Sequence, residues 1–156
     1  GTRFAYTIIP NSLKIYDDNG NSYKLNDLWL RRQSTKFNGT SYIIQKGAES
    51  VFTKKGQDEV RKLVDYYLSN AKIIQSGLEK IGIKYVGGKN SPYIWLKTPN
   101  NMSSWDFFHK LLNEANVVGT PGVGFGKCGE GYFRLTAFGK SEQITEAMER
   151  LKKLTF

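Results

Sequence analysis

The longest regular pattern of apolar positions runs from Gln57 to Ile81. Apolar side chains recur every three or four residues, which is the spacing of one helix face: Val60, Leu63, Val64, Tyr67, Leu68, Ala71, Ile74, Leu78 and Ile81. Thr53 suits the N-cap position, and Gly82 stands where a C-terminal glycine is expected. At about 1.5 Å per residue, such a helix exceeds roughly 30 Å in length. A helix of this length is suited to connecting two lobes.

The chain ahead of this helix predicts shorter elements. Residues 4–9 form a short β-like run, and residues 11–26 are polar and rich in turn formers, as in a surface hairpin. Residues 28–52 show a mixed, more helical pattern. One face of it would carry Ile43, Ile44, Gly47, Ala48 and Val51.

Strands are predicted at three places after Gly82. Residues 93–96 and residues 132–138 have the apolar, aromatic and β-branched composition of strands, and residues 117–118 are expected to begin another.

Two further helices are predicted among these strands. Ser103 or Ser104 would cap the first, and Ser141 would cap the second. Their apolar faces comprise Phe107, Phe108, Leu111, Leu112 and Ala115, and then Ile144, Ala147, Met148, Leu151 and Leu154. Strands separated by helices favour a compact α/β lobe.

Charge leaves several classes of partner open. The net charge is +9, with 23 Lys and Arg against 14 Asp and Glu, which could suit nucleic acid, an acidic surface or a small anion. The excess is spread evenly, because residues 1–78 carry 12 basic and 7 acidic side chains and residues 79–156 carry 11 and 7. Basic arms are usually blocks of charge, so this distribution argues only weakly for nucleic acid.

Composition excludes other classes. The hydrophobic fraction of 39% is that of a globular chain rather than a disordered one. The single cysteine, Cys128, excludes an internal disulfide framework and an all-cysteine zinc site. His109 is the only histidine, so a His-based metal site or triad is not expected, and His109 is interpreted as a surface residue. No apolar run approaches the roughly 20 residues of a membrane span.

A glycine-rich segment, residues 119–131, contains a G-x-G-x-x-G match at residues 124–129. A dinucleotide-binding fingerprint requires a preceding strand and a following helix. Here a strand follows instead, so the segment is interpreted as an irregular loop between strands. Glycine would also allow the backbone to approach a ligand closely.

Two arginines are candidates for binding anions, and two asparagines stand in loops. Arg134 lies within an apolar predicted strand, which is either an edge strand with Arg134 in water or a strand that points the side chain into a cleft. In a cleft, its planar fork would bind a carboxylate through two hydrogen bonds. Arg3, in a Gly-Thr-Arg turn, could bind a phosphate, although a solvated side chain is favoured. Asn38 and Asn90 stand in ordinary turn sequences.

Several tracts together resemble the class I aminotransferases, and within them the LL-diaminopimelate aminotransferase branch. The resemblance covers essentially the whole chain. The tract Pro121–Gly139 and the tract Asn90–Trp95 are specific to that branch, whereas the Gly-x-Arg and the late strand arginine are shared by class I generally. The tracts occur in the order Gly1–Arg3, Thr35–Gly39, Tyr66–Tyr67, Gly87–Trp95, Ser103–Asp106, Thr120–Gly126 and Gly129–Gly139.

The resemblance implies a fold-type-I, pyridoxal-phosphate-dependent enzyme of α/β class. Residues 1–56 would be the end of the large cofactor-binding domain, residues 57–82 the connecting helix, and residues 83–156 the small C-terminal domain. That small domain would contain a short, mainly antiparallel sheet packed by helices.

The resemblance also implies roles for three residues. Arg3 would hold the phosphate of pyridoxal 5'-phosphate, Asn38 would reach cofactor and substrate across a dimer interface, and Arg134 would bind the substrate α-carboxylate. The Schiff-base lysine would lie just upstream of Gly1, so this chain would hold no catalytic residue. The chain is therefore expected to be the C-terminal segment of the enzyme, inactive by itself.

The implied reaction is amino transfer between LL-2,6-diaminopimelate and 2-oxoglutarate, on the tetrahydrodipicolinate side of lysine and peptidoglycan precursor synthesis. The alternatives are an aspartate or aromatic aminotransferase and, from a different class, a basic nucleic-acid-binding module without enzymatic activity. The resemblance implies a homodimer with no metal, nucleic acid or membrane partner. The enzyme would lie in the cytoplasm of a bacterium or in the plastid stroma of a plant or alga.

Overall fold

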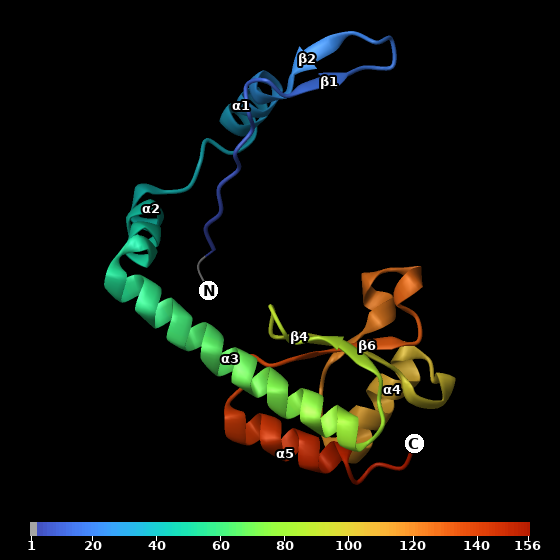
Figure 1. Ribbon diagram of the computed structural model, residues 1–156. Helices are drawn as coiled ribbons and strands as arrows, with labels where there is room; N and C mark the ends of the chain where they lie inside the picture. Colours follow the sequence, from blue (N-terminus) through green and yellow to red (C-terminus); the bar gives the residue numbers. More distant parts are fainter. Residues whose placement is uncertain (1–2) are drawn as a thin grey trace. The chain divides into compact units, whose positions relative to one another are not determined.

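A computed structural model of the chain describes residues 3–156 (Figure 1). The chain divides into a first unit that ends at Glu59 and a second unit, Val60–Phe156. Helix α3 (Lys54–Lys80) contains this boundary. The division into residues 1–56, 57–82 and 83–156 stays a prediction.

The first unit contains a hairpin and two helices. Strands β1 (Lys14–Tyr16) and β2 (Ser22–Lys24) pair antiparallel and are followed by α1 (Leu25–Lys36) and α2 (Tyr42–Glu49). The predicted hairpin and the helical character of the next residues are confirmed. Asp17 holds the hairpin turn, since its carboxylate accepts hydrogen bonds from the backbone N–H groups of Asn19 (3.0 Å) and Asn21 (2.9 Å).

The strand predicted at residues 4–9 is wrong. This segment carries the composition of a strand, but it pairs with no other strand in the part of the chain that the structure describes. A strand needs a neighbour to bond its backbone groups. A side chain anchors the end of the segment instead, because the Asn26 amide nitrogen donates to the carbonyl of Ile9 at 2.7 Å.

Helix α3 has the two ends that its sequence predicts. The backbone N–H of Gly56 donates to Thr53 Oγ1 at 3.0 Å, which confirms the N-cap. At the other end Gly82 has a φ of +72°, its N–H donates to Glu79, and Ile83 donates to Leu78, as in a Schellman motif. The helix begins at Lys54, directly after its cap, and the apolar pattern detects it only from Gln57 because the first turn is polar.

The second unit is built on a four-stranded antiparallel sheet with the order β3-β4-β6-β5. These strands are β3 (Tyr85–Gly87), β4 (Tyr93–Lys97), β5 (Thr120–Pro121) and β6 (Tyr132–Thr136). The expected antiparallel sheet is confirmed, but two details differ. Strand β6 lies between two neighbours, so the edge-strand alternative for Arg134 is wrong. The strand expected at residues 117–118 is also wrong, because the Val117 N–H bonds back to Leu111 and pairing begins only at Thr120.

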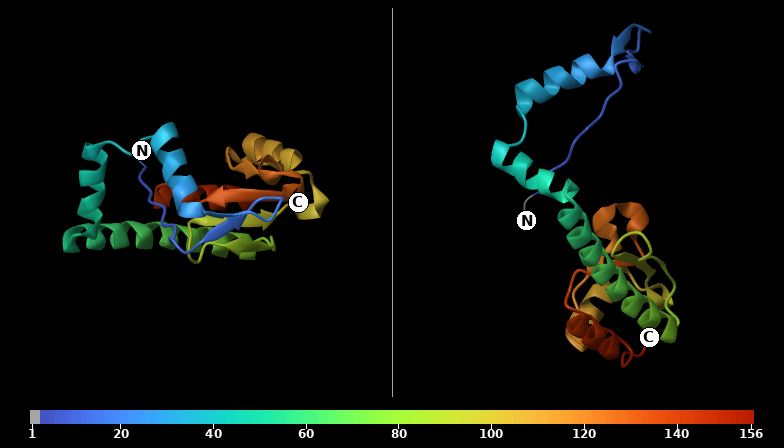
Figure 2. Two further views of the ribbon diagram at one scale, coloured as in Figure 1. Left: turned by 90° about the horizontal axis from the view of Figure 1, so that it is seen from above. Right: turned by 60° about the vertical axis from the view of Figure 1, so that its left-hand side comes forward.

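Helices cover one face of this sheet. Helices α3 and α5 (Ser141–Leu151) lie side by side, in contact where Gly77 meets Met148 (Figures 1 and 2). Helix α4 (Ser104–Lys110) continues into a π-helical turn and packs Phe107 on Phe133 of β6, with ring centroids 5.1 Å apart. The core comprises Ala71, Ile74, Leu78, Ile83, Ile94, Leu96, Phe107, Leu111, Ala115, Phe133, Leu135, Ala137, Ile144, Met148 and Leu151.

The helix caps of this unit agree only in part with the sequence. Ser103 is the N-cap of α4, since its Oγ accepts the Asp106 N–H at 3.0 Å. The cap predicted for Ser141 is wrong, because Lys140 is the N-cap and Ser141 is already the first helical residue. The Ser141 hydroxyl instead donates to the buried side chain of Asn70 at 2.5 Å.

Within residues 3–156, no helix has both the length and the apolar character needed to cross a bilayer.

Candidate functional site

Arg134 occupies the face of the sheet that the helices leave open. Along β6, Phe133 and Leu135 are buried toward the helices, so the alternation of a strand directs Arg134 to the opposite face. The antiparallel register places it opposite Trp95 of β4 and Thr120 of β5. The interior position of β6 therefore presents a guanidinium from the middle of a sheet.

Two aromatic rings flank this guanidinium. The Arg134 Cζ lies 4.6 Å from the ring centroid of Tyr93 on β4 and 4.6 Å from that of Phe125 in the glycine-rich loop. A guanidinium packed on aromatic rings keeps its N–H groups available in its own plane, where they fit a carboxylate.

The charge of Arg134 has no partner among the residues that the structure describes. Its Nε is shielded from solvent and donates no hydrogen bond. The ion pairs found between residues 3 and 156 join side chains three or four positions apart, and none includes Arg134. The side chain as a whole is half-buried, so a guanidinium with a shielded, unbonded N–H and no ion-pair partner suits an anion supplied from outside.

The rings around Arg134 belong to a longer row of aromatic side chains. Tyr93 packs edge-on against Phe138, with centroids 5.4 Å apart, and Phe138 packs against Tyr67 of α3 at 4.9 Å. On the other side, Trp95 contacts Phe125 at 5.6 Å and stacks on Tyr132 at 5.7 Å. The open face is thus apolar around one cation.

A buried polar cluster fixes the turn that follows β6. Asn70 of α3 is fully buried, and its Nδ2 donates to the carbonyls of Ala137 (3.2 Å) and Gly139 (3.0 Å). The Ser141 N–H donates to the Tyr66 hydroxyl at 3.0 Å, and hydrogen bonding from Ser141 lowers the pKa of that phenol. Phe138 stands inside this turn, so the cluster helps to hold the row of rings.

The glycine-rich segment contains β5, and from Gly122 onward it is an irregular loop between β5 and β6, as predicted. It forms two 3₁₀ turns, Gly122–Phe125 and Lys127–Gly129, and it exposes the Cys128 thiol. Gly122 and Gly129 meet backbone to backbone, because a Cβ on Gly122 would lie 2.2 Å from the Gly129 carbonyl oxygen. The glycines at this contact are needed for packing within the loop.

Arg3 and Asn38 lie in the first unit, and Arg134 lies in the second. Arg3 is exposed, and the Gly1-Thr2 part of its predicted turn lies outside the described residues. Asn38 follows α1 with a φ of +66°, next to Gly39 at +102°, which confirms the turn. The binding roles of Arg3, Asn38 and Arg134 stay predictions.

Sequence patterns did not assign Tyr93, Trp95 or Phe125 to this site. The alternation of β4 separates Tyr93 and Trp95 from the buried Ile94 and Leu96, so strand periodicity could have placed both on the face of Arg134. For Phe125 no such signal exists, because it reaches Arg134 only through the path of an irregular loop.

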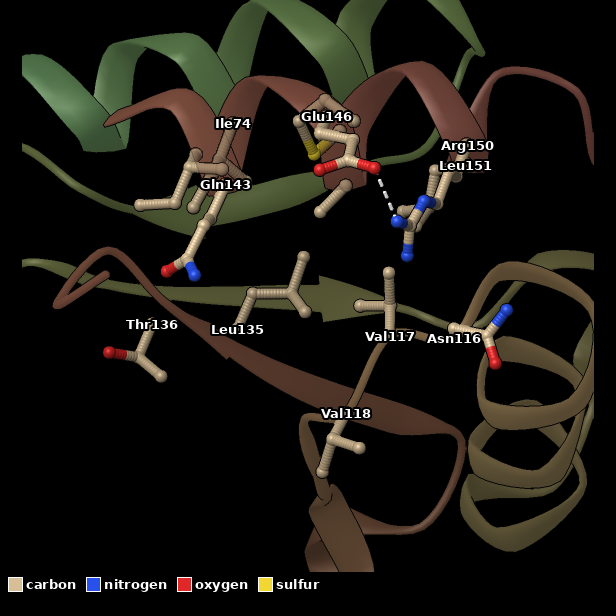
Figure 3. Close-up of a pocket in the computed structure, with 13 residues that line it drawn as sticks. Ile74, Asn116, Val117, Val118, Leu135, Thr136, Gln143, Glu146, Arg150 and Leu151 are labelled. Atoms are coloured by element: carbon tan, nitrogen blue, oxygen red, sulfur yellow. Dashed lines mark hydrogen bonds and ion pairs between the residues drawn. The ribbon is translucent and has the colours of Figure 1, made fainter. Parts of the chain in front are cut away.

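A separate cavity of about 460 Å³ lies between α5 and the segment around β6. Figure 3 shows Leu135 and Val117 on one side of it and Gln143, Glu146 and Arg150 on the other. Arg150 is ion-paired with Glu146 and donates to the Ala115 carbonyl at 3.4 Å. Because its arginine is already neutralised, this cavity suits an anion less well than the site of Arg134 does.

No three His, Cys, Asp or Glu side chains gather into a metal-binding group within residues 3–156. His109 is exposed on α4 beside Trp105 and Phe108, as expected of a surface residue.

Comparison with known proteins confirms the resemblance. A family model for aminotransferase class I and II matches residues 1–151. The LL-diaminopimelate aminotransferase of Methanosphaera stadtmanae is 54% identical over 156 residues, which are 100% of this chain and 38% of that protein. The LL-diaminopimelate aminotransferase of Azobacteroides pseudotrichonymphae is 55% identical over 154 residues, which are 99% of this chain and 38% of that protein.

Solved structures agree with these matches. The L,L-diaminopimelate aminotransferase from Chlamydomonas reinhardtii superposes with a TM-score of 0.83 at 37% identity, over 92% of this chain and 34% of that one. The chain thus spans little more than a third of the length of the curated relatives it matches. Since the family model covers nearly all of it, the chain belongs to the aminotransferase class I and II family.

Proposed function

We propose that the full-length protein transfers an amino group between LL-2,6-diaminopimelate and 2-oxoglutarate. The observation that carries this proposal is the unpaired guanidinium of Arg134 on the open face of the sheet, flanked by two rings. The similarity of the chain to two proteins named LL-diaminopimelate aminotransferase, at 54% and 55% identity, supports the choice of substrate.

Arg134 would bind the α-carboxylate that both substrates share. Two parallel N–H···O bonds fix the carboxylate plane as well as its position, so the substrate Cα–H bond acquires a defined direction. The apolar rings around the guanidinium exclude water from that contact, which strengthens it. Binding and orientation are thus the contribution of this part of the chain.

The family depends on pyridoxal phosphate, and the residues present fit that group. When bound, it supplies the electron-withdrawing ring that makes the Cα–H bond of an amino acid acidic. Arg3 would hold its phosphate, since the side chain is exposed and forms no ion pair with residues 3–156. Asn38 would contact both cofactor and substrate through its exposed carboxamide.

The carboxylate assignment is tested in the full-length holoenzyme with Arg134→Ala. We expect kcat/KM to fall for both substrates by the equivalent of about 2–5 kcal/mol, while pyridoxal phosphate stays bound. Arg134→Lys keeps the charge and loses the fork, so it should recover only part of the loss. An unchanged kcat/KM in Arg134→Ala would refute the assignment.

We also propose that the enzyme is a homodimer in which Asn38 acts in the partner's site. Co-expression of Asn38→Ala and Arg134→Ala subunits tests this proposal. If the two residues serve one site from different subunits, each mixed dimer keeps one intact site, and random pairing restores about a quarter of the wild-type activity. If both residues act within one subunit, mixing restores none.

The competing functions predict different results. An aspartate or aromatic aminotransferase would show a higher kcat/KM for those amino acids than for LL-diaminopimelate. A basic binding module would show salt-dependent affinity for nucleic acid without transamination. The matches to aminotransferases over nearly the whole chain give the nucleic-acid alternative no support.

A further inference from the structure

We propose that Phe125 is a positioning residue for Arg134, and that the Gly122–Gly129 contact holds it in place. This inference rests on the proposed role of Arg134 as the carboxylate-binding residue. The glycine-rich segment would then serve to pack the ring of Phe125 against the Arg134 guanidinium.

The two rings that flank the guanidinium come from supports of different kinds. Tyr93 belongs to β4, which is hydrogen-bonded on both sides, and its ring also packs on Phe138. Phe125 is the last residue of a short 3₁₀ turn, is 54% exposed, and contacts the sheet through Arg134 and Trp95. Removing Phe125 would therefore free one side of the guanidinium without removing a core residue.

The backbone of the loop determines where Phe125 stands. A Cβ at Gly122 would lie 2.2 Å from the Gly129 carbonyl oxygen, and a Cβ at Gly129 would lie 2.0 Å from that of Gly122. These distances are far below van der Waals contact, so only glycine allows the two turns to close on each other.

The closed loop is also fastened to the rest of the unit. The buried hydroxyl of Ser104, at the start of α4, donates toward the carbonyls of Gly129 (3.2 Å) and Tyr132 (2.9 Å). The Ser104 N–H donates to the Glu130 carboxylate at 2.8 Å. The loop therefore carries Phe125 on a fixed support rather than on a free tip.

A fixed second ring changes how well Arg134 can bind a carboxylate. An arginine side chain loses rotamer freedom when it binds, and a ring that already restricts the guanidinium reduces that loss. The ring also displaces water from the guanidinium and adds an attraction that depends on its planar charge. Both effects act on binding of the α-carboxylate, so they should appear in KM for both substrates.

The test uses the full-length holoenzyme with Phe125→Leu, which keeps the apolar bulk and removes the ring. We expect KM for LL-diaminopimelate and for 2-oxoglutarate to rise together, by about 3- to 30-fold, with a smaller change in kcat and in Tm. Phe125→Tyr restores a ring and should restore KM. Trp105→Leu, at an exposed ring of α4 that contacts only Phe108 and His109 among aromatic neighbours within residues 3–156, is the control and should leave KM unchanged.

A matched pair of glycine variants tests the support of Phe125. Gly129→Ala introduces the 2.0 Å contact, with obstructing atoms that all belong to the loop, and should raise both KM values as Phe125→Leu does. Gly124→Ala, in the same loop, adds a Cβ that meets no atom within 4 Å and should leave both KM values unchanged. Equal KM values in the two glycine variants would refute the role of the Gly122–Gly129 contact.

A double-mutant cycle separates this inference from the proposed function. A lysine at position 134 cannot stack its charge as a planar group, so Phe125→Leu should raise KM much less in the Arg134→Lys background. An equal rise in both backgrounds would overturn the positioning role. If Arg134→Ala impairs binding and Phe125→Leu does not, the proposed function stands and this inference fails.

Discussion

The two units of the chain differ in what becomes of their apolar side chains: only the second unit buries them. In the second unit, a continuous core joins one face of the sheet to α3, α4 and α5. From residue 3 to residue 59 no side chain is buried, and Tyr6, Ile8 and Ile43 are 75%, 80% and 80% exposed. An apolar residue is thus buried only where the fold offers a second apolar surface for it.

The first unit contains an apolar helix face with no buried core against it. The helix face predicted from Ile43, Ile44, Gly47, Ala48 and Val51 exists, and it lines one depression together with Phe4, Ala5, Tyr6 and Phe52. Its periodicity is that of a core-facing helix, but within this unit it has no core to face. Contiguous apolar surface of this kind is typical of contacts with other protein surface.

The largest expected effect is a difference in cooperative unfolding between two fragments of the chain. A fragment of residues 53–156 keeps the α3 N-cap and the whole core of the second unit, so we expect it to unfold cooperatively in urea. Residues 1–52 contain no buried side chain among those described, so we expect no cooperative transition. Dispersed amide resonances in 1–52, or their absence in 53–156, would contradict this comparison.

Within that fragment, one helix contains both environments. Leu78 of α3 is fully buried, whereas Leu63 of the same helix is 53% exposed. We expect Leu78→Ala to lower the free energy of unfolding by about 2–5 kcal/mol, because it leaves a cavity. Leu63→Ala should cost less than about 1 kcal/mol, since it leaves none. Denaturant titration of the two variants measures the difference, and equal losses would contradict it.

The polar cluster of the second unit gives a smaller effect. Asn70→Ala leaves the carbonyls of Ala137 and Gly139 and the Ser141 hydroxyl without their partner, so we expect a loss of about 1–3 kcal/mol. Ser69→Ala, which removes an exposed hydrogen bond to Tyr66, is the neighbouring control and should lie within about 0.5 kcal/mol of the wild type. A control as destabilised as Asn70→Ala would argue against the cluster.

The smallest expected effects come from replacing one glycine by alanine in each unit. Gly82 has a φ of +72° at the end of α3, so Gly82→Ala should destabilise the second unit by about 1–2 kcal/mol, although no atom obstructs its Cβ. Gly47 lies within α2 with ordinary helical backbone and open space, so Gly47→Ala should raise helix stability by up to about 1 kcal/mol. Thermal unfolding measures the first variant and circular dichroism the second. The same sign for both would refute the backbone argument.

Local signals predicted much of the fold. The 3–4 spacing of apolar residues in α3, the Thr53 cap and the Gly82 end each depend on residues within one or two turns of each other. The predictions that failed are those that depend on a distant partner. Residues 4–9 have the composition of a strand but no strand beside them among the described residues, and Ser141 could cap α5 but bonds Asn70 of another helix.

The candidate site divides in the same way. Two features of the sequence indicate Arg134, namely its apolar neighbours in the chain and its resemblance to the late strand arginine of class I aminotransferases. Strand β6 lies inside the sheet because it pairs with both β4 and β5. The residues next to Arg134 in the sequence do not indicate either of these pairings. The sequence predicts that the glycine-rich segment is irregular, but only the structure places Phe125 against the Arg134 guanidinium.

The sequence by itself determined where helices lie, both ends of α3, the charged residue in the apolar strand, and the family. Each of these is recorded in short-range spacing or in tracts of adjacent residues. The tertiary structure alone decided which face of the sheet is covered, which strand is interior and which rings flank Arg134. Those features arise from contacts between residues far apart in the chain, where the position of one partner carries no information about the other.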